Sequence, residues 1–108
     1  MLHEVHDRVS LALAQPVAEG LRAHPEWVEL AKANLDHWTQ RNRNSPGLLR
    51  CYAEWQGLLD RPIEEICAIL MDRSDEGQRL RQNSPFAGVL SPREVWSIKR
   101  KVHETARS

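Results

Sequence analysis

Apolar residues recur at helical spacing along most of the chain, and this pattern predicts its secondary structure. The first repeat predicts a helix over residues 3–23 that Pro16 either kinks or divides. A second apolar stripe begins after Pro25 and fades at residues 40–42, which predicts a second helix. No segment alternates with period two for long enough to predict a strand.

Serine and proline mark the starts of the later helices. Pro46 and Pro62 predict the beginnings of a third and a fourth helix, and Ser74 begins a brief fifth. Ser91-Pro92-Arg93-Glu94 is a capping box that begins a last helix reaching to about residue 104. The sequence therefore predicts an all-α single domain over residues 1–108, with five or six short helices. We expect the stripes of its second, third and fourth helices to form the core.

The segment between the last two helices is unusually apolar for a loop. Pro85 ends the fifth helix, because the residue before a proline disfavours the α region. Phe86, Val89 and Leu90 are too apolar for a solvated linker, and Gly88 permits a tight turn. We expect this loop to dock, and docking within this chain is favoured over docking on another protein.

The charges sum to zero but are unevenly distributed. Lys plus Arg and Asp plus Glu number 15 each in 108 residues. Residues 1–45 carry a net charge of −1, residues 46–76 carry −4 and residues 77–108 carry +5. The last two segments therefore form an acidic and a basic half.

Motifs for catalysis, metal binding or membrane insertion do not emerge from the sequence. Cys51 and Cys67 are too far apart for a C-x-x-C pair, and His3 and His6 lack the H-E-x-x-H spacing of zinc proteases. All five glycines are isolated, so no phosphate-binding loop or dinucleotide fingerprint is present. No apolar run reaches 18 residues. These features predict a cytoplasmic protein that is not an enzyme and needs no cofactor or metal.

Nucleic-acid binding is an alternative that the sequence leaves open. Ala53 and Gly57 have the spacing of a helix-turn-helix, but its second helix would present Glu64 and Glu65 to DNA phosphates, which repel carboxylates. The basic C-terminal region is the better candidate, with Arg79, Arg81, Arg93, Lys99, Arg100, Lys101 and Arg107. Trp27, Trp38 and Trp55 lie on apolar faces and are predicted core residues, whereas we expect Trp96 to be partly exposed.

Two segments of the C-terminal half carry a family resemblance. "LLDRPIEEICAIL" from residue 58 and "SDEGQRLRQNSPFAGVLSPREVWSIKR" from residue 74 resemble small bacterial antitoxins of toxin–antitoxin modules whose toxin is a nucleotidyltransferase. The resemblance implies an all-helical protein without catalysis of its own, which binds its cognate toxin and silences it.

Two binding geometries follow from this resemblance and the charge layout. The acidic segment around Glu64 and Glu65 would compete for a basic catalytic groove of the toxin, with an apolar anchor from Phe86 and Trp96. Alternatively, the basic last helix would grip metal-binding carboxylates of the toxin. The predicted partner-binding residues are Glu64, Glu65, Arg79, Arg81, Phe86, Leu90, Arg93, Trp96, Lys99 and Arg100.

Overall fold

The computed structural model describes the backbone of residues 2–107 and the side chains of residues 6–105. Over this range the chain forms six helices and no strand, which confirms the predicted all-α fold. The helices are α1 (Leu2–Ala23), α2 (Trp27–Arg41), α3 (Pro46–Leu58), α4 (Ile63–Leu70), α5 (Asp75–Arg81) and α6 (Pro92–Arg107). None of these six combines the length with the hydropathy that a membrane span requires.

The helices begin where the sequence predicts. In the capping box of α6, the Glu94 amide donates to Ser91 Oγ at 3.1 Å, and the Ser91 amide donates to the Glu94 carboxylate at 3.0 Å. The hydrogen bond from the Ser91 backbone holds the pKa of Glu94 below its usual range. Ser74 caps α5 by accepting a hydrogen bond from the Gly77 amide at 3.2 Å. Ser45 precedes α3 without a side-chain capping bond, so Pro46 alone marks that start.

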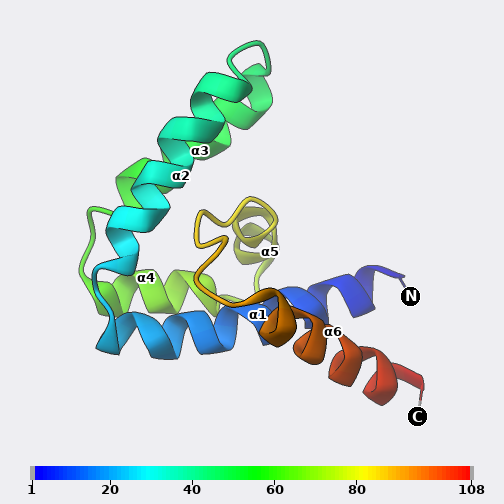
Figure 1. Cartoon of the computed structure of the whole chain (residues 1–108). Helices are drawn as coiled ribbons and strands as arrows, with labels where there is room; N and C mark the ends of the chain where they lie inside the picture. The colour runs from blue at the N-terminus through cyan, green and yellow to red at the C-terminus, as the bar shows by residue number, and fades with distance from the viewer. Residues whose placement is uncertain (1, 108) are drawn as a thin grey trace.

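The helices are arranged as a base and a hairpin. α1 runs unbroken through Pro16, and α4, α5 and α6 all pack against it. α2 and α3 pair as a hairpin that leans away from α1, α4 and α6 (Figure 1). α5 and the loop over residues 82–91 occupy the corner between this hairpin and the base (Figure 1).

The core lies in this corner around Trp55, whose side chain is completely buried. Its indole N–H donates to the Leu80 carbonyl at 2.9 Å, and the Phe86 ring meets it edge-on with 6.4 Å between centroids. α2, α3 and α4 contribute buried residues as predicted. α1 contributes as well, which the prediction missed, because α1 is the base on which α4 and α5 pack. Its buried residues are Ala14, Val17, Ala18 and Leu21.

Two of the predicted core tryptophans are only half-buried. Trp27 lies over Gly20 at the junction of α1 and α2, and its ring stacks on His24 with 5.2 Å between centroids. Trp38 packs against the ring of Tyr52 with 5.8 Å between centroids. These rings close the two ends of the hairpin, and only Trp55 lies at its buried centre.

The apolar loop docks on the domain, as expected. Phe86 is 4% exposed, which stabilises the fold by roughly 1.5–3 kcal/mol. Asn34 of α2 holds the loop by donating from Nδ2 to the carbonyls of Pro85 at 2.9 Å and Ala87 at 3.0 Å. Gly88 has a φ of +93°, which L side chains rarely adopt, so the turn requires a glycine.

Candidate functional site

The acidic segment is largely neutralised by basic side chains from other parts of the chain. Arg22 donates two hydrogen bonds to the Glu64 carboxylate, at 2.8 and 3.0 Å, and these hydrogen bonds lower the pKa of Glu64. Asp60 pairs with Lys32 at 3.2 Å. Glu65 is exposed and makes no ion pair with any side chain from residue 6 to residue 105. Of the two carboxylates predicted to contact a partner, only Glu65 is therefore unpaired.

Arg79 is also engaged within the chain. Its guanidinium pairs with Glu54 at 2.7 Å and with Glu76 at 2.9 Å. The hydrogen bonds to Glu76 and then to Glu54 raise the pKa of Arg79 above its ordinary value. Arg79 therefore ties α5 to α3, and a partner would have to displace these carboxylates to reach it.

Arg81, a predicted partner contact, lies in the interior of the free chain. Its side chain is only 2% exposed. Nε donates to Ser10 Oγ at 2.8 Å, and Nη2 pairs with Asp7 at 3.2 Å. Nη1 donates to the carbonyls of Leu70 and Asp72. Arg81 thus joins α1 to the connection between α4 and α5, and a partner could reach it only through the cavity that it helps to line.

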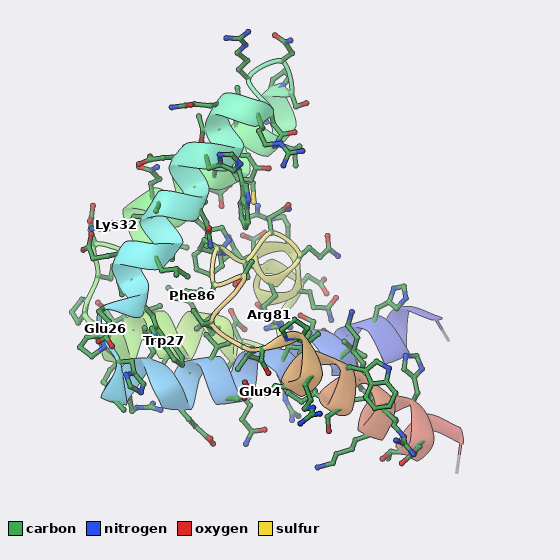
Figure 2. All side chains as sticks on the ribbon, viewed as in Figure 1. Glu26, Trp27, Lys32, Arg81, Phe86 and Glu94 are labelled. Carbon is green, nitrogen blue, oxygen red and sulfur yellow. The ribbon has the colours of Figure 1, made fainter. Side chains whose placement is uncertain are left out.

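Phe86, also a predicted partner contact, is likewise an internal anchor of the loop in the free chain. Figure 2 shows Arg81 and Phe86 in the corner between the hairpin and α1. The Phe86 ring packs edge-on against Trp55, and the little surface left to it lines a cavity beside α1.

A cavity of about 380 Å³ lies between α1, the loop and α6. This volume falls within the range of small-molecule and side-chain pockets. Its walls are mainly apolar and include Val9, Leu13, Val17, Phe86, Leu90 and Val95. Its charged or titratable lining residues are His6, Arg81 and Lys99, and no carboxylate lines it among the described side chains. The cavity therefore suits an apolar group that is accompanied by negative charge.

The outer side of α6 is cationic and carries an exposed aromatic ring. Trp96 is 61% exposed, and the Arg100 guanidinium lies over its ring, 5.3 Å from the centroid. Arg100 also pairs with Glu104 at 3.1 Å. We call the exposed basic residues of α6 together with Trp96 the α6 surface; they are Arg93, Trp96, Lys99, Arg100 and Lys101, and Glu94 and Glu104 are exposed on the same helix.

The cavity and the α6 surface adjoin. Lys99 lies three residues after Trp96 and four after Val95, so it stands between the exposed ring and the cavity wall on the same helix. Five predicted contacts are thereby brought together, namely Leu90, Arg93, Trp96, Lys99 and Arg100. Glu64 pairs with Arg22 near the end of α1, about 20 Å along that helix from Val9 in the cavity wall. One compact partner surface therefore fits the basic predicted residues better than the acidic ones.

Some residues of this region were not predicted as contacts. Val9 and Leu13 line the cavity at i, i+4 spacing, and the sequence pattern assigned them to the general apolar stripe of the first helix. Lys101 belongs to the basic last helix of the second predicted geometry, but it was not among the predicted partner-binding residues. Only the packing of α6 beside α1 reveals that Val9 and Leu13 share a cavity with Lys99.

Metal ligands do not cluster among the described side chains, where no three His, Cys, Asp or Glu residues converge. The side chain of His3, considered above with His6, lies outside the described residues. The chain matches no protein-family model, no curated protein and no solved structure.

Proposed function

We propose that the chain neutralises a toxin by direct protein contact, as an antitoxin of a module with a nucleotidyltransferase toxin. The α6 surface and the adjoining cavity are the contact region of this proposal. The observation that carries it is Trp96, a large aromatic side chain that is mostly exposed on the outer side of the amphipathic helix α6. Tryptophan and arginine are the residues most enriched at energetic hot spots of protein interfaces.

The immediate surroundings of Trp96 favour a role in binding. Arg100 covers part of the ring and holds a cation over its face. Such packing restricts the rotamers of the ring before a partner arrives, which lowers the entropy cost of association. The neighbouring cavity offers a place for an apolar side chain of the partner, so ring and cavity together resemble the desolvated centre of an interface.

The charges around Trp96 indicate the chemistry of the partner. Arg93, Lys99 and Lys101 make no ion pair with a described side chain, so their charge is available to another molecule. In contrast, Glu64 is bound to Arg22. The proposal therefore adopts the second geometry, in which the basic helix faces an acidic, carboxylate-bearing surface of the toxin.

Co-expression with the product of the neighbouring gene, which the proposal expects to resemble a nucleotidyltransferase, followed by calorimetry on the purified pair, tests this proposal. We expect Trp96→Ala to weaken binding by about 30-fold or more, the loss typical of a hot-spot residue. Leu30→Ala is the matched control, because Leu30 is also an exposed apolar residue but lies on α2. The control should bind as tightly as the natural chain.

Charge reversal separates the remaining outcomes. Lys99→Glu with Lys101→Glu should weaken toxin binding, and Glu64→Lys with Glu65→Lys should leave it nearly unchanged. The opposite result would favour the acidic geometry and refute the α6 surface. Absence of any complex with the neighbouring gene product would refute the antitoxin function itself. A salt-dependent shift of promoter DNA that requires Lys99 and Lys101 would favour the alternative of a nucleic-acid-binding regulator.

A further inference from the structure

We propose that the free end of the α2–α3 hairpin binds the phosphate backbone of a nucleic acid. Arg41 ends α2, Arg43 lies in the turn, and Arg50 lies in the second turn of α3. We call these three residues the arginine tip. Residues 37–53 contain no Asp or Glu, although the sum over the first 45 residues is slightly negative and hides this basic stretch.

The three guanidinium groups are available for binding. All three side chains are exposed, and none forms an ion pair with any other described side chain. This separates them from Arg22, Arg79 and Arg81, each of which pairs with a carboxylate of the chain. Gln40 and Asn44 are exposed beside the tip and add amide donors.

The backbone that carries the arginine tip is held by hydrogen bonds. Asn42 Nδ2 donates to the Trp38 carbonyl at 3.0 Å and to the Tyr52 hydroxyl at 3.3 Å. The Ser45 amide closes the turn by donating to the Asn42 carbonyl at 2.9 Å. The turn is thus fixed to both helices, so the backbone that carries the three cations is ordered before binding and less conformational entropy is lost when a ligand binds.

The composition of the tip favours phosphate over a protein surface. A protein interface is organised around a desolvated apolar centre, whereas nucleic-acid interfaces are polar and strongly cationic. Among the side chains of residues 6–105 the exposed large apolar residues are Leu30, Met71 and Trp96, and none of them lies at the tip. Arginine forks match the geometry of phosphate oxygens and bind them in pairs.

The position of the tip lets it reach a large ligand. The turn between α2 and α3 is the end of the hairpin that points away from α1, α4 and α6 (Figure 1). The α6 surface belongs to the base, so the two regions can be tested separately. Binding at the tip does not depend on the proposed toxin contact.

Fluorescence anisotropy with labelled duplexes of about 20 base pairs, one DNA and one RNA of the same sequence, tests the proposal. Titrations between about 50 and 200 mM NaCl give the slope of log K against log salt for each duplex. The natural chain should bind at least one duplex, and the duplex that it prefers identifies the source of the phosphate. The variant Arg41→Gln/Arg43→Gln/Arg50→Gln should bind at least about tenfold more weakly at the lowest salt. Its slope should be shallower by about 2 to 3, because each lost phosphate contact removes about 0.9 from the slope on a DNA duplex.

The matched control removes three charges from α6 by Arg93→Gln/Lys99→Gln/Lys101→Gln and should retain the slope of the natural chain. Circular dichroism checks that both variants are folded. We chose glutamine because it is a good helix former and should leave the helices intact. Failure of the natural chain to bind either duplex at the lowest salt would overturn the proposal. Equal losses in both variants would also overturn it, since the binding would then be a general charge effect. Poly-glutamate that competes as well as a duplex would show that the tip prefers carboxylates, which contradicts it too.

Discussion

Replacement of Arg81 by leucine should destabilise the protein more than replacement of any exposed arginine. Leucine fills part of the same volume but has no donor. The change leaves the carbonyls of Leu70 and Asp72 without their guanidinium partner and removes the ion pair of Asp7. Ser10 Oγ loses its donor as well.

The cost follows from the burial of these groups. A buried polar group without a partner costs about 1–3 kcal/mol, and breaking a buried ion pair costs about 3–5 kcal/mol. The Asp7 side chain is 27% exposed, so water can partly solvate its carboxylate after the substitution. We therefore expect a loss near the lower end, about 3–4 kcal/mol of the ~5–15 kcal/mol that stabilises a typical domain. For a chain of this length the melting temperature should fall by about 15 °C.

Urea unfolding followed by circular dichroism and tryptophan fluorescence measures this loss as a lower midpoint with an unchanged slope. Arg79→Leu is the matched control, two residues away on the same helix, with both of its ion pairs at the surface. It should shift the midpoint far less, because exposed ion pairs contribute little. Equal shifts for the two variants would refute the assignment of Arg81 as the buried connection between α1 and the α4–α5 turn.

Three further substitutions and one chemical modification test the packing. Gly57→Ala should stabilise the protein by about 0.5–1 kcal/mol, because the new methyl group meets open space on a helix. Gly77→Ala should instead destabilise it, because its methyl group would overlap the backbone carbonyl five residues earlier; equal effects in urea would contradict this packing. Asn34→Ala should cost about 1–3 kcal/mol and expose the loop to proteolysis, since two loop carbonyls lose their donor. Burial raises the pKa of Cys51 and Cys67, so a thiol reagent at pH 8 should modify neither in the folded chain and both in urea.

The helices could be predicted from the sequence because their signals are local. A serine followed by a proline fixes a helix start through the missing amide and the preset φ of the ring, whatever the rest of the chain does. Ser91 and Glu94 make the two predicted capping bonds for this reason. The docking of the loop could also be predicted from a local signal, because an apolar Phe86 between two helix boundaries indicates a buried loop, and the ring is buried.

The sequence could not predict which charged side chains are paired and which are exposed, because ion pairs join residues that are far apart in sequence. Arg79 and Arg81 are two positions apart and look alike in the sequence, but one reaches the surface and the other meets Asp7, which is 74 residues away. Arg22 pairs with Glu64 across 42 residues. Sums over segments count such pairs as available charge, so they overstated the charge of the acidic half. They also add the unpaired arginines of the tip to acidic residues elsewhere in the same segments, which hid the arginine tip.

The packing of α6 connects the proposed function with the stability of the fold. Each described residue of α6 is at least partly exposed, and Val95, Ile98 and Val102 are its half-buried apolar residues. With this shallow contact α6 gains less from burial than α4, which buries Ile66, Cys67 and Leu70 in its eight residues. A partner that covers Trp96 and fills the cavity would add apolar burial on the side where the domain has least. Binding energy at that site would therefore also hold α6 against α1, and the folded state would gain stability with partner concentration.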